Sequence, residues 1–232
     1  MGESYLISYS ISSHNLMWII GIIMSQIYYV AIGKKYHIKF PQSLFTGIMI
    51  LFFEIVSAKI LFILENINNF SVEYFSLASG YSLYGVFIFM PIFLMPISKI
   101  IFNKNLLIMD FASIGILIEL AFYRIGCYIS GCCGGIEISG FGAFPVQIIE
   151  LVFDLLISTI LLIIALRKNQ FNNFLFSYVY ILYGILRFIL EFLRIRENIL
   201  FAFSISHFLS IITIIIGLTI IIVTNKKKYK NN

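Results

Sequence analysis

Charged side chains are scarce in this sequence: Asp, Glu, Lys and Arg make up 12% of its 232 residues, about half of the share typical of soluble domains. Hydrophobic residues make up 60% of the chain. Too few polar side chains remain to cover a soluble globule, which excludes a soluble domain and indicates a membrane protein. The net charge of +5 does not indicate a nucleic-acid partner, because the basic residues lie in short blocks between long apolar runs.

Cysteine is also scarce, and the three cysteines all fall within the short segment 127–133. This pattern excludes the disulfide framework of a small secreted domain. The spacing is not that of a paired C-x-x-C zinc site, and His14 and His37 are expected to lie far away or on the opposite side of the membrane. We therefore predict no metal site and no cofactor. A disulfide remains open, and packing as small polarizable side chains is the favoured role.

Long apolar runs are abundant, and seven of them could each cross a bilayer, which takes about 20 helical residues. We predict an all-α integral membrane protein that forms one seven-span domain over residues 1–232, because the connections are too short for a soluble domain. The first run is expected to span the membrane rather than to serve as a cleaved signal peptide. The predicted spans are residues 15–33, 42–64, 80–102, 106–128, 145–166, 171–194 and 200–224, followed by a basic tail at 225–232.

Lys and Arg are distributed unequally between the two sets of loops. With the N-terminus outside, the inner side would hold Lys34, Lys35, Lys39, Lys99, Lys104, Arg167, Lys168, Lys226, Lys227, Lys228 and Lys230. The outer side would hold Arg124, Arg194 and Arg196. Because basic residues concentrate in cytoplasmic loops, we predict an external N-terminus and a cytoplasmic C-terminus. The basic tail is explained by this topology and by attraction to anionic membrane lipids.

Several ionisable side chains fall inside the predicted spans, where a charge facing lipid costs at least about 2.5–3.5 kcal/mol. They are Lys59, Arg124, Arg187, Arg194, Glu54, Glu119, Glu150, Asp154 and Glu191. Under the predicted orientation all but Glu54 belong to the outer half, and the two signs nearly balance. Arg187, Glu191 and Arg194 share one helical face through their i, i+4 and i+7 spacing. We predict one shared polar cavity that opens outward, although Arg124 and Arg194 could instead extend to the outer headgroups.

An outward-opening cavity rich in arginine favours a phosphate ligand. Guanidinium groups stay charged and bind phosphate oxygens in pairs. The phosphate most available at this depth is the headgroup of an outer-leaflet phospholipid. The glycines of segment 126–135 could allow close backbone approach in a phosphate-binding or re-entrant turn.

Four stretches, in order, resemble the signature of the prolipoprotein diacylglyceryl transferase family of seven-span bacterial enzymes. They are GYSLYG at 80–85, RIGCYISGCCGG at 124–135, FPVQIIE at 144–150 and YGILRFILEFLR at 183–194. The last stretch is the most specific, and the resemblance covers about residues 75–215. All four stretches lie at the outer ends of predicted spans, where the charge distribution independently places the cavity.

The resemblance implies transfer of the diacylglyceryl group of phosphatidylglycerol to the lipobox cysteine of a lipoprotein precursor. Glycerol phosphate would be released at the outer leaflet of the bacterial plasma membrane. The resemblance implies catalytic roles for Arg124 and Arg187, and for Tyr84 in place of a family histidine. It implies substrate-binding roles for Glu191, Arg194, Gly85, Gly126, Cys127, Gly131, Cys132, Gly135, Gln147, Glu150 and His207.

Three positions depart from the family pattern besides Tyr84. Cys127 replaces an asparagine, Cys132 aligns with a glutamate, and His207 aligns with a glutamine of the last span. These departures leave open a second interpretation, a non-catalytic or other-acceptor phospholipid-binding paralogue. A transporter or a retinal-type receptor is less favoured, because the chain shows no inverted repeat and span 200–224 contains no lysine.

Overall fold

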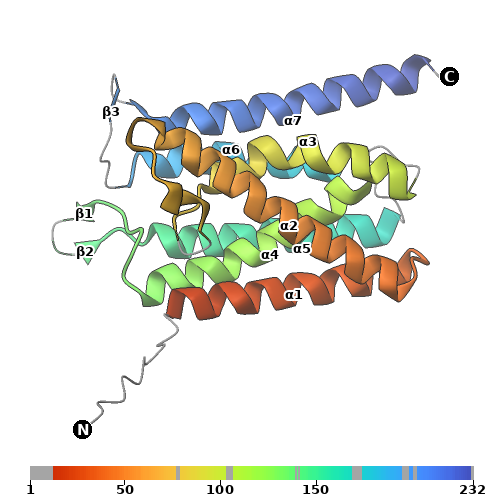
Figure 1. Cartoon of the computed structure of the whole chain (residues 1–232), viewed down its shortest axis with the longest axis horizontal. Coiled ribbons are helices and arrows are strands. Elements are labelled where there is room, and N and C mark those ends of the chain that lie inside the picture. Colours follow the sequence, from red (N-terminus) through yellow and green to blue (C-terminus); the bar gives the residue numbers. More distant parts are fainter. Residues whose placement is uncertain are drawn as a thin grey trace, which may run out of the picture.

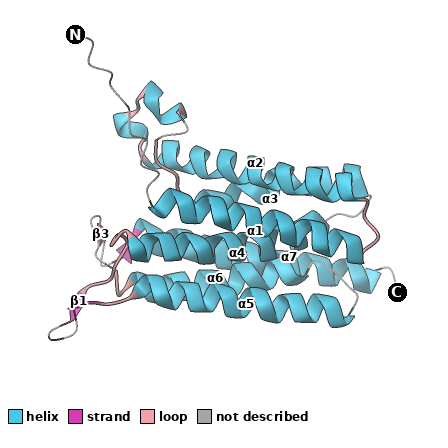
Figure 2. Cartoon of the chain, turned by 90° about the horizontal axis from the view of Figure 1, so that it is seen from below, coloured by secondary structure: helices cyan, strands magenta, loops and turns pink. Residues whose placement is uncertain are grey.

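Seven long α-helices account for most of the described residues in a computed structural model of the chain (Figure 1). The structure describes residues 13–76, 79–102, 107–138, 140, 142–168, 174–194, 199–200 and 203–230. The helices are α1 (Ser13–Lys35), α2 (Phe40–Glu65), α3 (Leu83–Phe102), α4 (Leu107–Ile129), α5 (Val146–Lys168), α6 (Phe174–Glu191) and α7 (Ile205–Lys230). They run nearly parallel or antiparallel in a single bundle, and the chain reverses direction between successive helices (Figures 1 and 2).

Short elements gather at the end of the bundle where α1 begins. Two 3-10 helices, Ile67–Asn69 and Val72–Phe75, connect α2 to α3. The antiparallel pair β1 (Glu137–Ile138) and β2 (Gly142–Ala143) precedes α5, and the pair β3 (Ile199–Leu200) and β4 (Phe203–Ser204) precedes α7. We call this end of the molecule the hairpin end.

The predicted all-α membrane protein is confirmed. Five of the helices within the described residues are long and apolar enough to cross a bilayer: α1, α2, α3 as far as Ile100, α5 as far as Arg167, and α7 as far as Val223. The helices differ most from the predicted spans at two boundaries: α6 ends at Glu191 rather than at 194, and strand β4 delays the start of α7 until Ile205. Lys104 and Arg196, used in the orientation prediction, lie outside the described residues.

Helix α4 lies at the centre of the bundle and contacts α1, α2, α3, α5 and α6. Every residue from 108 to 117 is buried. The peripheral helices α5 and α7 instead expose large apolar side chains such as Leu156 and Ile215. Because α4 is enclosed by other helices, the ionisable residues that it carries face protein rather than lipid.

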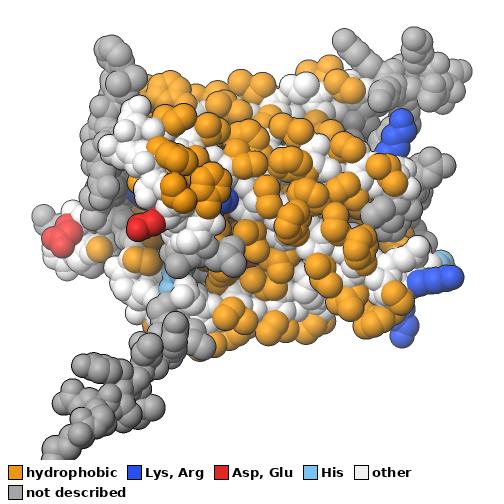
Figure 3. All heavy atoms as spheres, in the orientation of Figure 1, with side chains coloured by type: hydrophobic (Ala, Val, Ile, Leu, Met, Phe, Trp, Pro, Cys, Tyr) orange, Lys and Arg blue, Asp and Glu red, His pale blue; other side chains and the backbone are white. Residues whose placement is uncertain are grey.

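The surface has the pattern expected of a bilayer protein. Apolar side chains cover the middle of the face seen in Figure 3, and most of the Lys and Arg side chains visible there gather at the end opposite the hairpin end. Lys34 and Lys35 belong to this basic end, since they form the last turn of α1. The acidic side chains visible in this view lie toward the hairpin end.

Gly85 allows α3 to pack directly on the backbone of α2. A Cβ atom at position 85 would lie 2.9 Å from the Cα of Ala58 and closer still to the carbonyl oxygen of Ser57. Both neighbours are backbone atoms that cannot rotate away. Packing therefore explains this glycine of the GYSLYG stretch without reference to a ligand.

Replacement of Gly85 by alanine should separate α2 from α3. We expect Gly85→Ala to lower the free energy of unfolding in detergent micelles by about 1–3 kcal/mol, as overpacking does in other cores. Gly134→Ala is the control, because a Cβ there meets nothing nearer than 3.6 Å. Its effect should stay within about 0.5 kcal/mol. Equal stability of the two variants would contradict the close approach.

Candidate active site

Three arginines converge on one buried carboxylate near the hairpin end. Glu150, in the second turn of α5, is completely buried. Its Oε2 lies 2.5 Å from Nε of Arg124 on α4 and 3.0 Å from Nη2 of Arg194, just beyond α6. Its Oε1 accepts a hydrogen bond from Nη1 of Arg187 on α6. We call these four residues the arginine cluster.

The arginine cluster carries more positive than negative charge. A second carboxylate, Glu191, lies 3.6 Å from Nη2 of Arg187. Among the described residues, the three guanidinium groups form ion pairs with two carboxylates, so these five groups together carry one net positive charge. Arg124 is 4% exposed, so its side chain is enclosed by the bundle and does not extend to the headgroups. A buried excess of positive charge favours the binding of an anion.

Asp154 lies one helical turn beyond Glu150 on α5, and it is also buried. Neither of its carboxylate oxygens has a hydrogen-bond partner among the described residues. Asp154 therefore borders the arginine cluster without joining its network of hydrogen bonds.

A hydrogen-bonded chain leads from Arg187 to His207. Oε1 of Glu191 accepts a hydrogen bond from Oγ of Ser204 at 2.8 Å. The backbone N–H of Ser204 in turn donates to Nδ1 of His207 at 3.0 Å. In a neutral imidazole this places the ring proton on Nε2. The ring is held among Phe188, Phe192 and Phe203, so His207 supports the carboxylate that pairs with Arg187.

Tyr84 borders the arginine cluster with the face of its ring. The guanidinium carbon of Arg187 lies 5.6 Å from the ring centroid. The Tyr84 hydroxyl lies 2.7 Å from Oγ of Ser210 on α7. Because Ser210 donates its own proton to the carbonyl oxygen of Ser206, Tyr84 is the donor in this hydrogen bond. The Tyr84 hydroxyl thus forms its hydrogen bond with α7 rather than with the cluster, which does not favour the catalytic role predicted for Tyr84.

Gly131 terminates helix α4. Its φ of +67° lies in the left-handed region, where glycine is favoured. The N–H of Gly131 donates to the carbonyl of Tyr128 at 3.2 Å, and the N–H of Cys132 donates to the carbonyl of Cys127 at 3.0 Å. This pair of hydrogen bonds is a Schellman motif. The cap brings Cys132 back over Cys127, and Nε2 of Gln147 donates to the Cys132 carbonyl oxygen at 2.6 Å.

Gly135 lies where the same segment crosses the end of α6. A Cβ atom there would lie 2.5 Å from the carbonyl oxygen of Leu193. The next residue, Ile136, donates its N–H to that carbonyl at 2.9 Å. Gly131 therefore ends helix α4, Gly135 allows close packing against the end of α6, and Gln147 holds the capped segment in place. Any part that they play in substrate binding remains a prediction.

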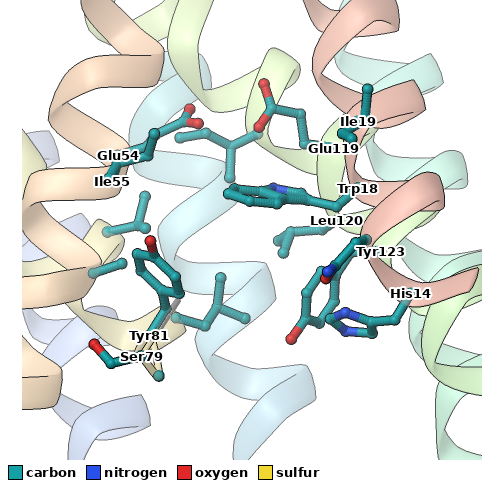
Figure 4. Close-up of a pocket in the computed structure, with 16 residues that line it drawn as sticks. His14, Trp18, Ile19, Glu54, Ile55, Ser79, Tyr81, Glu119, Leu120 and Tyr123 are labelled. Atoms are coloured by element: carbon teal, nitrogen blue, oxygen red, sulfur yellow. The ribbon is translucent and has the colours of Figure 1, made fainter. Parts of the chain in front are cut away.

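The prediction of a single polar cavity is wrong. Glu54 and Glu119 face a different cavity of about 660 Å³ between α1, α2, α3 and α4 (Figure 4). Arg124 comes five positions after Glu119, which places the two side chains about 140° apart around α4. Lys59 is likewise five residues from Glu54, and its Nζ donates to the carbonyl oxygens of Ser76 and Gly80 at 2.9 and 3.0 Å.

Aromatic rings line this second cavity, and two glutamate side chains lie at one end of it. The carboxyl groups of Glu54 and Glu119 lie beyond the ring of Trp18, at the same end of the cavity (Figure 4). Glu119 also accepts a hydrogen bond from the hydroxyl of Ser25. Tyr81 and Tyr123 lie on opposite sides of the cavity (Figure 4). We call this space the acid-pair cavity.

The expectation that His14 lies far from the cysteines is also wrong. One ligand atom each from His14, Cys127 and Cys132 lie within 4.8 Å of one another. Helix α1 packs along α4, and Gly126 allows the approach, since a Cβ there would lie 2.9 Å from the Cα of His14. This proximity could not be predicted because the residues lie far apart in the sequence. The same is true of the hydrogen bonds that Ser204 and Ser210 form with Glu191 and Tyr84.

The arginines also act electrostatically on residues 127–133, which we call the cysteine segment. Hydrogen bonding from Cys127 lowers the pKa of the Cys133 thiol, and a hydrogen bond from Cys132 and the nearby Arg124 and Arg194 act in the same direction. Cys133 is exposed, while Cys127 is buried. The cysteine segment and the arginine cluster are thus neighbours at the hairpin end.

Comparison with known proteins supports the resemblance. A family model described as prolipoprotein diacylglyceryl transferase matches residues 4–223. The phosphatidylglycerol–prolipoprotein diacylglyceryl transferase of Clostridium tetani is 32% identical over an alignment of 187 positions that covers 71% of this chain and 73% of that protein. The protein of the same name from Finegoldia magna is 26% identical over 243 aligned positions that cover 97% of this chain and 98% of that protein. Transferase 2 of Clostridium perfringens is 27% identical over 230 aligned positions that cover 90% of this chain and 89% of that protein.

Loss of the Glu150 charge should destabilise the bundle. Glu150→Gln leaves the buried guanidinium groups of Arg124 and Arg187, and the partly exposed one of Arg194, without their shared carboxylate. Breaking a buried ion pair costs about 3–5 kcal/mol. We expect a loss of this size in the free energy of unfolding, measured by denaturant titration in mixed micelles. Asp154→Asn, one turn away, is the control and should cost far less. Similar losses in both variants would show that Glu150 is not the centre of the cluster.

Proposed function

This chain belongs to the prolipoprotein diacylglyceryl transferase family, and we propose that it transfers the diacylglyceryl group of phosphatidylglycerol to a cysteine thiol of a lipoprotein precursor. The family model covers nearly the whole chain, and the C. tetani relative carries this activity in its name. In the reaction the thiol sulfur bonds to the carbon of the diacylglyceryl group that bears the phosphate ester. The bond between that carbon and the phosphate oxygen breaks, and glycerol phosphate leaves with the electron pair and takes up the proton that the thiol loses.

The observation that carries the proposal is the convergence of Arg124, Arg187 and Arg194 on Glu150. The leaving phosphate gains negative charge as the carbon–oxygen bond breaks. Preorganised cations in a site that excludes water stabilise such charge most effectively. We assign Arg124 and Arg187 to the phosphate of the lipid headgroup. Arg194 supports them from the outer side, where its side chain is more exposed than theirs.

Glu150 and Glu191 position the guanidinium groups in this proposal. Glu150 holds all three arginines, and Glu191 holds Arg187 through the Ser204 and His207 chain. An entering phosphate would compete with the carboxylates for the same guanidinium donors. An anionic headgroup is therefore bound in preference to a neutral or zwitterionic one.

We propose a seven-span topology with an external N-terminus, in the bacterial plasma membrane. The hairpin end, which holds the arginine cluster, would face outward. The Lys34 and Lys35 end of α1 would face the cytoplasm. Helices α4 and α6, which carry Arg124, Arg187 and Glu191, would then complete the set of spans. This arrangement gives the cluster access to outer-leaflet phosphatidylglycerol.

A second candidate is a phospholipid-binding paralogue that has lost the transfer step. The observation that favours it is the Tyr84 hydroxyl, which donates to Ser210 where the family commonly carries a histidine. Incubation of the purified protein with labelled phosphatidylglycerol and a lipobox peptide separates the two candidates. Labelled thioether peptide supports transfer, whereas retention of labelled lipid without product supports the paralogue.

Removal of either central arginine should abolish transfer. We expect Arg124→Ala and Arg187→Ala to reduce the rate of peptide labelling by at least about 100-fold, as loss of a charge-stabilising donor does in other enzymes. Arg167→Ala is the control, because Arg167 lies exposed at the opposite end of α5. Its rate should equal that of the unmodified protein. Undiminished labelling in both cluster variants, in protein that still inserts into membranes, would overturn the assignment.

Two substitutions of Tyr84 distinguish a base from a ring that positions Arg187. If the ring face matters, Tyr84→Phe should retain labelling within about threefold, since the cation–π contact survives, while Tyr84→Ala should lose far more. The measurement is the initial rate at saturating peptide and lipid. A rate for Tyr84→Phe as low as that for Tyr84→Ala would instead assign the chemistry to the hydroxyl.

A further inference from the structure

Three side chains with soft or borderline metal-binding atoms meet at the hairpin end, outside the arginine cluster. The imidazole of His14 and the thiols of Cys127 and Cys132 offer ligand atoms within 4.8 Å of one another. Cys133 follows Cys132 directly in the chain, and it is exposed. Each cysteine is free, and no mechanism proposed above uses any of them.

The backbone holds this group of side chains in place. The Schellman cap at Gly131 brings Cys132 over Cys127, and Cys133 follows with a positive φ of 60°. His14 comes from the start of α1, where a hydrogen bond of 3.1 Å between Oγ of Ser13 and Oγ of Ser130 ties the helix to the same segment. Packing among these elements therefore fixes the position of the group.

The orientation of His14 is also set. Its ring packs edge-on against Tyr123, with ring centroids 4.4 Å apart. A histidine ring fixed in this way can present one nitrogen to the thiols without a large loss of side-chain entropy. Cys127 is buried, whereas His14 and Cys132 are partly exposed, so an ion could enter from the hairpin end.

The donor set suits a tetrahedral ion. Zinc takes cysteine sulfur at about 2.3 Å and histidine nitrogen at about 2.0–2.1 Å, which separates neighbouring ligand atoms by about 3.5–3.8 Å. Small side-chain rotations would close the present separations to that range. A disulfide would use only two of the thiols and would leave the imidazole and the third thiol without a role. A bridge between the adjacent Cys132 and Cys133 would also be strained.

We propose that His14, Cys127 and Cys132 bind a zinc ion, with Cys133 completing a tetrahedral Cys₃His site. The ion joins the start of α1 to the end of α4. It also fixes the Cys132 carbonyl oxygen, to which Gln147 donates three residues before Glu150. The site therefore stabilises the segment that leads into α5 and the arginine cluster. It is a structural site and takes no part in the transfer step.

The experiment measures metal content in protein purified anaerobically in detergent and exposed to excess zinc. We expect about one zinc ion per chain after removal of free metal. Cobalt in its place should give the thiolate-to-metal charge-transfer bands and intense visible bands of a tetrahedral site. Zinc should also raise the midpoint of thermal unfolding and protect the cysteines from alkylation, because it binds only the folded chain.

Matched variants assign the ligands. Cys127→Ser, Cys132→Ser and His14→Ala should each weaken cobalt binding by at least roughly 100-fold, since loss of an outer-shell partner alone costs 10–100-fold. His37→Ala is the control, because His37 follows α1 at the opposite end of the bundle, and it should bind as the unmodified protein does. Size-exclusion profiles and thermal unfolding without metal show that each variant folds.

Three results would overturn the proposal. The first is the absence of stoichiometric zinc or cobalt in fully reduced protein. The second is unchanged binding in the ligand variants. The third is a disulfide between two of the three cysteines, without bound metal, in protein isolated anaerobically. None of these results bears on the labelling of a lipobox peptide, so the zinc site and the proposed transfer reaction can fail separately.

Discussion

The pairing of three guanidinium groups with the Glu150 carboxylate is the interaction on which the hairpin end of the molecule depends. It joins α4, α5 and the end of α6 through a carboxylate that is completely buried. Buried ions of one sign tolerate each other only around a shared counter-charge. The same arrangement leaves positive charge, so the contacts that hold the helices together also form the proposed site for an anionic ligand.

Helix α4 divides the interior into two polar regions. One face carries Glu119 toward the acid-pair cavity, and another carries Arg124 toward Glu150. Keeping acids and arginines on different faces of one helix prevents Glu119 from neutralising the arginine cluster. In the proposed function the cluster binds a phosphate, which belongs both to the phosphatidylglycerol headgroup and to the glycerol phosphate that leaves in the transfer reaction.

The position of the cysteine side chains depends on both a local helix cap and a long-range contact between helices. Spacing in the sequence predicts neither a paired zinc motif nor a nearby histidine. The αL cap at Gly131 and the packing of α1 on α4 nevertheless bring His14 to Cys127 and Cys132. A cap could have been anticipated from the glycine that follows an apolar run. The approach of α1 could not, because 113 positions separate His14 from Cys127.

The sequence by itself determined the membrane environment, the approximate extent of the seven helices and the gathering of arginines at one end, because apolar length and charge distribution are local properties. It also identified Arg124, Arg187 and Glu150 as candidates, since ionisable residues within spans are rare. Only the tertiary structure decided which charges meet. It separated Glu54 and Glu119 from the arginine cluster, turned the Tyr84 hydroxyl toward Ser210 and placed His14 beside the cysteines. Those outcomes depend on the rotation of each helix about its axis, which is fixed by packing against its neighbours.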